Sequence, residues 1–303
     1  MQLKLDEKKI RKGRSIGLPY IGSKKKISKK LIEIIKQNFG TDKTVYDLFG
    51  GGGAVTLECK LQGLDVVYND VDPIPGLMIQ KIVSEDREYL KTLICSREEF
   101  FQIRDKEDKT IDDHLKLLIN SFGNNNKDYL YSKKDSEFKY KLARTIIEKH
   151  DCFEGYKQTK TFKKVLYETK KITQLKRVQQ LGRVAQLENM KVIPSLEIHN
   201  KDYKEFSEIK NSIIYLDPPY KDTSKVYKHN NLNYEEFYKW CKDMNKDNIV
   251  LISGYHMPDD FEIVYEFTKA KSTMQSGQHE SKYEKLYMVK DNHYFVQLFD
   301  RKR

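Results

Sequence analysis

The stretch YLDPPY, residues 215–220, places a carboxylate, two prolines and an aromatic ring directly after an apolar run. Proline has no amide hydrogen to donate to a sheet, so the predicted strand ends here. Asp217 offers a carboxylate oxygen, and the prolines, Pro218 and Pro219, hold the Pro218 carbonyl in a fixed direction at little entropic cost. With the flat ring of Tyr220 beside them, these two acceptors suit a planar amine.

The exocyclic amine of adenine is such a group. Its lone pair is delocalised into the ring, so the nitrogen is a poor nucleophile, and two acceptors near its hydrogens favour a more tetrahedral form. Tyr220 could stack on a base taken out of a duplex. Methyl transfer to this nitrogen would then depend on positioning and electrostatics, without a covalent enzyme intermediate. A plain surface turn is the alternative interpretation, and the position behind a buried strand argues against it.

A second cluster lies in DLFGGGGAVT, at the end of another predicted strand, and its candidate residues are Asp47, Phe49, Gly51 and Gly53. Glycines let the backbone approach a ligand, and the carboxyl end of the first strand is where nucleotide-like ligands bind in open α/β sheets. Asp70 ends the second predicted strand, where an acid commonly takes ribose hydroxyls. A helix-entry cap and a turn residue are the alternatives for Asp47 and Asp70, and their joint spacing favours the ligand.

Two common phosphate-binding patterns do not fit this turn. No GK follows it, as a P-loop needs, and Val55 or Thr56 stands where GxGxxG needs its last glycine. Asp47 would also repel a pyrophosphate. An acid here suits a ligand with a cationic amino group, such as S-adenosylmethionine.

The elements that must position these residues follow an interrupted α/β rhythm. Apolar periodicity predicts helices over residues 27–39 and 54–63, and strands over the following ranges: 44–49, 64–70, 196–200, 212–217, 248–253, 261–267 and 293–299. Between residues 72 and 190 the periodic segments are helical. In the last of them Leu175, Val178, Leu181, Val184 and Leu187 recur every three residues, as a buried helix stripe does. We therefore expect one α/β domain, residues 1–72 and 191–303, with a helical domain, residues 73–190, inserted into it.

Composition limits the partners and the compartment. The 303 residues carry a net charge of +11, and residues 127–191 hold a surplus of nine basic side chains. This charge indicates a solvated helical face or a surface that binds phosphates. No apolar run could span a membrane, the basic residues 1–14 look like a flexible lead-in rather than a signal peptide, and the four scattered cysteines form no CxxC pair. A cytoplasmic protein without a metal site is expected.

The order of these segments resembles the Dam-like, or D12, class of DNA adenine-N6 methyltransferases of phages and bacteria, over nearly the whole chain. PYIGSK is similar to the class's N-terminal segment, which implies that Tyr20, Gly22 and Lys24 contact the cofactor. NKDY is similar to its third-strand motif, which implies that Asp202 approaches the cofactor's adenine with Tyr203 beside it. The four-glycine run is looser than in many relatives, which leaves the individual glycine contacts open.

The resemblance implies a Rossmann-like catalytic domain that binds S-adenosylmethionine, a DPPY motif whose Asp217 also lies near the cofactor's methionine, and base flipping from double-stranded DNA. It places target recognition in residues 73–190, where SFGNNNKDYLYSK is similar to phage-type relatives. Many such enzymes work as monomers, so a monomer is expected. The recognition sequence, and whether a cognate restriction endonuclease accompanies the protein, are left open.

Three rival functions share some of these sequence features. Cytosine C5 methylation needs a cysteine nucleophile, and no cysteine follows a proline in a suitable strand-end loop. Methylation of RNA or of a protein amide could use the same acceptors, but the basic helical region favours nucleic acid, and no RNA-binding signature is visible. A non-catalytic DNA-binding module with a degenerate cofactor fold is disfavoured by the intact DPPY stretch and glycine turn.

Overall fold

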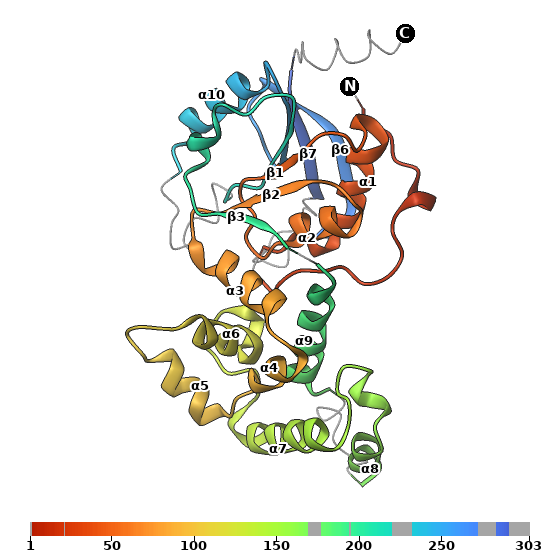
Figure 1. Ribbon diagram of the computed structural model, residues 1–303, viewed down its shortest axis with the longest axis vertical. Coiled ribbons are helices and arrows are strands. Elements are labelled where there is room, and N and C mark those ends of the chain that lie inside the picture. Colours follow the sequence, from red (N-terminus) through yellow and green to blue (C-terminus); the bar gives the residue numbers. More distant parts are fainter. Residues whose placement is uncertain are drawn as a thin grey trace. The chain divides into compact units, whose positions relative to one another are not determined.

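The computed structural model describes residues 2–20, 22–168, 177–193, 195–219, 232–271 and 283–290, with the side chains of all but residues 268–271. The chain divides into two compact units (Figure 1). One is an α/β unit made of Met1–Ser15, Lys24–Gly76 and Leu196–Arg303. The other is a helical unit made of Leu77–Ser195, together with the short segment Ile16–Ser23.

A seven-stranded sheet in the order β3-β2-β1-β4-β5-β7-β6 forms the centre of the α/β unit. The strands are β1 Val45–Asp47, β2 Val66–Asn69, β3 Glu197–His199, β4 Ile213–Leu216, β5 Ile249–Gly254, β6 Phe261–Lys271 and β7 Tyr283–Val289. The first five in this order pair in parallel, and β7 pairs antiparallel with both β5 and β6. The chain leaves β1 toward β2 and β3 and later returns to β4 on the other side, so a topological switch point lies between β1 and β4. The predicted Rossmann-like sheet is confirmed.

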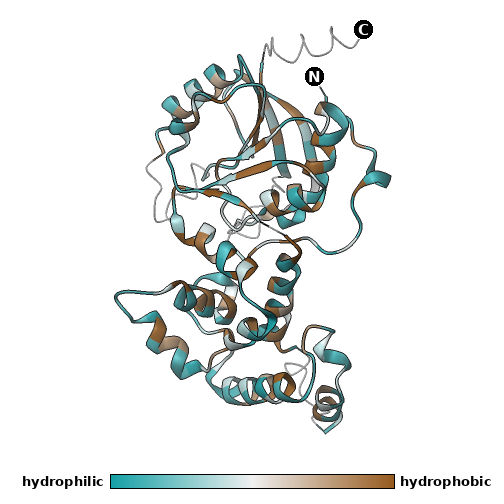
Figure 2. Cartoon of the chain, in the orientation of Figure 1, coloured by the Kyte–Doolittle hydropathy of each residue, from teal (hydrophilic) through white to brown (hydrophobic). Residues whose placement is uncertain are grey.

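Side chains of the central strands alternate between two buried faces, as strand geometry requires. Ile213 and Tyr215 pack with α1 Ser28–Phe39 and α2 Ala54–Leu61, whereas Ile214 and Leu216 pack with α10 Tyr234–Met244 (Figure 1). Cover on both faces explains why these strands appear in the sequence as largely apolar runs, and Figure 2 shows brown stretches among the strands of this unit. The predicted strand over residues 293–299 lies outside the described residues, and β7 had not been predicted.

The N-terminal lead-in is ordered in the structure, so the prediction of a flexible lead-in was wrong. The amide of Leu3 donates to the carbonyl of Val264 on β6, at the edge of the sheet. The guanidinium of Arg11 makes two hydrogen bonds, of 2.6 and 2.9 Å, to the carboxylate of Glu58, whose side chain is fully buried in α2. The segment covers an exposed strand edge and neutralises a buried acid.

The helical unit contains α4 Arg87–Thr92, α5 Arg97–Arg104, α6 Ile111–Asn120, α7 Lys133–Lys149, α8 Lys160–Glu168 and α9 Gln179–Glu188, and α3 Pro73–Ser84 leads into it. Side-chain caps begin α5, α6 and α7, the one on α6 being a complete capping box between Thr110 and Asp113. Of the predicted α9 stripe, Val178, Leu181, Val184 and Leu187 are fully buried, and Leu175 lies outside the described residues. None of the described helices combines the length and apolar character that a membrane crossing requires.

Candidate active site

The glycine turn after β1 is shaped by conformations that other residues adopt poorly. Gly51 and Gly53 have φ angles of 45° and 71°, in the left-handed region. A Cβ on Gly50 would lie 2.3 Å from the ring of Tyr68, so no side chain fits there. Tyr68 donates from its hydroxyl to the Gly51 carbonyl at 2.9 Å, and Asp70 accepts from the Gly51 amide at 2.8 Å. The end of β2 therefore holds the turn that follows β1.

Asp47 lies buried below this turn. Its carboxylate accepts from the amide of Thr56 at 3.1 Å and from the Thr56 hydroxyl at 2.6 Å, which caps the first turn of α2. Burial raises the pKa of Asp47 to about 7, and the nearby carboxylates of Asp217 and Asp70 contribute in the same direction. The residue therefore serves as a helix cap, the alternative that the sequence had suggested, and also brings acidic character to the strand ends.

Asn69 is a further residue at this edge that the sequence pattern did not single out. Its side-chain amide donates to the carbonyls of Leu48 and Lys201, at 3.1 and 2.9 Å, and accepts from the Lys201 amide at 2.9 Å. It thereby ties together the chain segments after β1, β2 and β3. A buried asparagine at a strand end satisfies its own polar atoms while it fixes neighbouring loops. In the sequence, the feature that could have identified Asn69 is its position directly before Asp70.

The carboxyl end of β4 carries the DPP segment and an ion-pair cluster. The ammonium of Lys24 lies 2.7 Å from an oxygen of Asp217 and 3.3 Å from an oxygen of Glu284 on β7. Lys24 and Glu284 are buried, and Asp217 is partly exposed. Burial by itself would lower the pKa of Lys24, but the charges of Asp217 and Glu284 outweigh it and hold this pKa well above its usual value. The lysine therefore stays protonated at any working pH.

Two tyrosines support the DPP segment. The hydroxyl of Tyr215, buried within β4, forms a 2.7 Å hydrogen bond with the hydroxyl of Ser253 on β5. Tyr234, the first residue of α10, donates to the carbonyl of Pro219 at 2.5 Å. The segment is thus held from the strand that it leaves and from the helix that follows it in the chain.

Phe49 and Tyr203 stack on each other, with ring centroids 5.8 Å apart. Tyr203 is buried against Phe237 and Trp240 of α10, while Phe49 is half-buried. Asp202 is exposed and caps the short helix η7 Tyr203–Phe206 by accepting from the Lys204 amide at 2.9 Å. The aromatic pair extends the site from the glycine turn toward β3.

Three of the predicted site residues, Tyr20, Gly22 and Tyr220, are not among the described residues of the α/β unit. Tyr20 is half-buried and Gly22 has a φ angle of 74°, and both fall in the segment Ile16–Ser23 that groups with the helical unit. Tyr220 lies outside the described residues. Within the α/β unit the structure thus brings together the glycine turn, Asp47, Asp70, Lys24 and Asp217, while the cofactor roles of all these residues stay predictions.

Comparison with known proteins identifies the chain. Residues 20–293 match the family described as D12 class N6 adenine-specific DNA methyltransferase. The chain belongs to this family. It is therefore an enzyme that transfers a methyl group to the N6 amine of adenine in DNA, as the resemblance implied. A search of curated proteins found no significant match.

The cysteines of this methyltransferase are unsuited to nucleophilic catalysis. All four are free and buried: Cys59, Cys95, Cys152 and Cys241. Burial raises the pKa of each thiol, to about 12 for Cys95 and about 11 for Cys152, so little reactive thiolate forms at neutral pH. The rejection of a cytosine C5 mechanism, which needs a thiolate, agrees with this chemistry.

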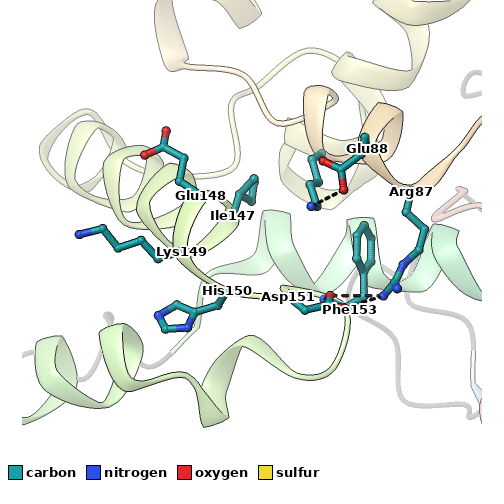
Figure 3. A pocket seen from close by; sticks show the side chains of 9 residues that line it. Arg87, Glu88, Ile147, Glu148, Lys149, His150, Asp151 and Phe153 are labelled. Carbon is teal, nitrogen blue, oxygen red and sulfur yellow. Dashed lines mark hydrogen bonds and ion pairs between the residues drawn. The ribbon is translucent and has the colours of Figure 1, made fainter.

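The helical unit of the methyltransferase has a surface hollow of about 360 Å³ (Figure 3). It is lined by Arg87, Glu88, Lys91, Ile147, Glu148, Lys149, His150, Asp151 and Phe153. Arg87 pairs with Asp151 and Glu188, and Lys91 pairs with Glu88. Arg87 and Lys91 are thus already matched by acids, which weakens their attraction for a phosphate.

Proposed function

We propose that the enzyme transfers the methyl group of S-adenosylmethionine to the N6 amine of an adenine flipped out of double-stranded DNA, at a specific sequence. The observation that carries this proposal is the lysine-bound Asp217 at the end of β4, adjacent in the sheet to the glycine turn after β1. Donor and acceptor sites on neighbouring strand ends, at the switch point of the sheet, suit a direct transfer.

The side chains around the glycine turn fit this cofactor. S-adenosylmethionine carries an activated methyl group on a sulfonium and a cationic amino group. Asp47 lies close enough to the carboxylates of Asp217 and Asp70 for their charges to raise its pKa, so three acids gather at this edge. Such a region favours a cation and disfavours a pyrophosphate. Phe49, half-buried beside the turn, offers an apolar face.

Asp217 would act on the amine by accepting one of its hydrogens. One carboxylate oxygen contacts Lys24, and a carboxylate offers about four acceptor positions, so the same group can also receive a hydrogen bond from substrate. The carbonyl of Pro218 would accept the second hydrogen. Tyr234 supports this geometry by holding the next carbonyl, that of Pro219. The stacking role of Tyr220 against the flipped base belongs to the same proposal.

We assign DNA binding and target recognition to the helical unit. Its exposed basic residues include Lys133 and Lys134, in the first turn of α7, and Lys160 and Lys163 on α8. Among the described residues the structure gives these four no ion-pair acid, in contrast to Arg87 and Lys91. Unpaired lysines at the surface are suited to phosphate contacts.

The test is transfer of labelled methyl from S-adenosylmethionine to duplex DNA, single-stranded DNA and RNA in parallel, followed by identification of the methylated nucleoside. N6-methyladenine in duplex DNA, absent with Asp217→Ala, is expected. Label confined to RNA or to single strands would overturn the duplex substrate. Failure to bind S-adenosylmethionine, measured by calorimetry, would overturn the cofactor.

A further inference from the structure

The N-terminal lead-in, residues 1–14, runs along helix α1 of the α/β unit. Near its start, the amide of Lys4 donates to the side chain of Asn38, in the last turn of α1, at 2.9 Å. Near its end, the carbonyl of Gly13 accepts from the ammonium of Lys29, in the first turn of α1, at 2.7 Å. The segment therefore follows α1 from the C-terminal end of the helix to its N-terminal end.

The N-terminal end of α1 lies at the edge of the sheet that holds the candidate active site. The short helix η2 Lys24–Lys26 directly precedes α1, and its first residue contacts Asp217, which follows β4. The end of the lead-in is thus placed toward the carboxyl ends of the parallel strands. Its start, beside the last turn of α1, is placed toward the opposite edge.

The backbone that carries the last two basic residues of the lead-in is fixed. Arg11, paired with the buried Glu58, donates two further hydrogen bonds from its guanidinium. Their acceptors are the carbonyls of Lys12 and Arg14, at 2.9 and 2.8 Å. The carbonyl between them, that of Gly13, accepts from α1. Three consecutive carbonyls are therefore bound by cations that are anchored in α1 and α2.

The side chains on this backbone form a cationic surface. The lead-in has six basic residues and two acids, and one of those acids, Glu7, pairs with Lys30. Four of its basic side chains are exposed and have no ion-pair acid among the described residues, and we call them the lead-in cations: Lys8, Lys9, Lys12 and Arg14. Cations on a fixed backbone lose less entropy when they bind a partner, and a guanidinium can hold a phosphate through two hydrogen bonds.

We propose that Lys12 and Arg14 bind phosphates of the DNA strand that carries the target adenine, and that Lys8 and Lys9 extend this contact along the duplex. This inference rests on the proposed function. It adds a DNA-binding surface on the α/β unit to the one assigned to the helical unit.

The path of the target strand explains why cations are useful at this edge. A flipped nucleotide stays joined to its neighbours, so the phosphates on either side of it must come to the strand ends of the α/β unit. Three acids gather there, Asp47, Asp70 and Asp217, and their charges repel phosphates. Cations at the N-terminal end of α1 would offset this repulsion and hold the strand beside the site.

The salt dependence of DNA binding by the double variant Lys12→Gln/Arg14→Gln tests the proposal. Fluorescence anisotropy with duplex DNA gives the slope of the logarithm of affinity against the logarithm of salt concentration. Each phosphate contact that is lost should reduce this slope by about 1, so the double variant should lose about 2. At ~0.1 M salt the affinity should fall roughly eightfold per contact. The double variant Lys12→Arg/Arg14→Lys keeps both charges and should keep the parental slope.

A matched control is Lys210→Gln/Lys246→Gln. These exposed lysines precede β4 and β5, so the control removes two charges from the opposite edge of the same sheet and should keep the parental slope. A parental slope in Lys12→Gln/Arg14→Gln, or an equal loss in the control, would overturn the proposal. So would a loss of RNA binding with duplex binding retained. Melting temperatures of all variants check that the fold is kept.

Neutral methylphosphonates, placed one at a time around the mapped adenine, locate the contact on the DNA. In the parent, the positions next to the adenine should lose affinity. In Lys12→Gln/Arg14→Gln the same replacements should cost little, because the partner of each phosphate is already absent. Fully additive losses would overturn the assignment. If the parent makes no N6-methyladenine, the proposed function fails, whereas an unchanged salt slope in a double variant that still methylates DNA overturns this inference alone.

Discussion

The raised pKa of Asp47 predicts that cofactor binding depends on pH in a defined direction. Burial, with the charges of Asp217 and Asp70, places this pKa at about 7 instead of near 4, so much of the acid is neutral in the free enzyme at neutral pH. A cationic cofactor would bind the ionised form. Raising the pH through this value therefore creates more of the competent form, and the dissociation constant of S-adenosylmethionine should fall.

The size of this effect follows from the fraction ionised. If only the ionised form binds, the dissociation constant is multiplied by 1 + 10^(pKa − pH), which is about 11 at pH 6 and about 2 at pH 7. Affinity should thus rise about fivefold over this unit, while the amino group of the cofactor stays charged because such groups titrate near 7.7–8.0.

Isothermal titration calorimetry at constant ionic strength would measure the dissociation constant at the two pH values. Asp47→Asn cannot ionise, so we expect weaker binding without this pH dependence. An unchanged dissociation constant in the parent, or the same fivefold change in Asp47→Asn, would refute the assignment of the titration to Asp47.

Four further predictions follow from the contacts. Asp217→Ala should lower the methylation rate by at least about 10²- to 10³-fold, while Glu284 keeps Lys24 paired and the circular dichroism spectrum is retained; turnover near the parental rate would contradict the catalytic assignment. Tyr234→Phe loses the hydrogen bond to Pro219 and should lower kcat about tenfold at unchanged KM for DNA, so an effect on KM alone would point to a different role. Arg11→Ala leaves a buried carboxylate unpaired and should lower the free energy of unfolding by about 3 kcal/mol, with partial recovery when Glu58 is also changed to Gln; a denaturant titration unchanged from that of the parent would contradict it. DNA affinity should fall about 10³- to 10⁵-fold between roughly 50 and 200 mM salt if six to ten phosphate contacts form, and a flat response in fluorescence anisotropy would rule out that number of contacts.

The sequence predicted the parts of the fold that local patterns encode. Continuous apolar runs located β4 and β5, because strands covered on both faces need apolar side chains at every position. The glycine turn and the DPP segment were recognised for a similar reason, since glycine and proline restrict the backbone wherever they occur.

Contacts between distant segments could not be predicted in this way. Nothing in the local pattern of YEKLYMV shows that Glu284 would meet Lys24, since the meeting depends on β7 pairing beside β5. The lead-in over residues 1–14 looked flexible because its composition is basic, while its order comes from hydrogen bonds to β6 and α1 and from the ion pair of Arg11 with Glu58 on α2. Asp47 shows a second limit of prediction from sequence. The pattern offered a helix cap and a ligand contact as alternatives, whereas one carboxylate caps a helix and also lies at the proposed binding edge.

In the α/β unit, early segments of the chain contact the late strands β6 and β7. The order of synthesis therefore determines when these contacts can form. Lys24 is made early, whereas the edge strand β6, which receives the N-terminal segment, and Glu284 on β7 are made much later. The helical unit is compact in itself and is built mainly from Leu77–Ser195, so it can fold before β6 and β7 are made. A nascent or truncated chain that stops before β7 would therefore hold Lys24 and Asp217 without the shared acid. Only chains that include β7 would carry Glu284 beside Lys24 and Asp217, so shorter products would lack part of this ion-pair cluster.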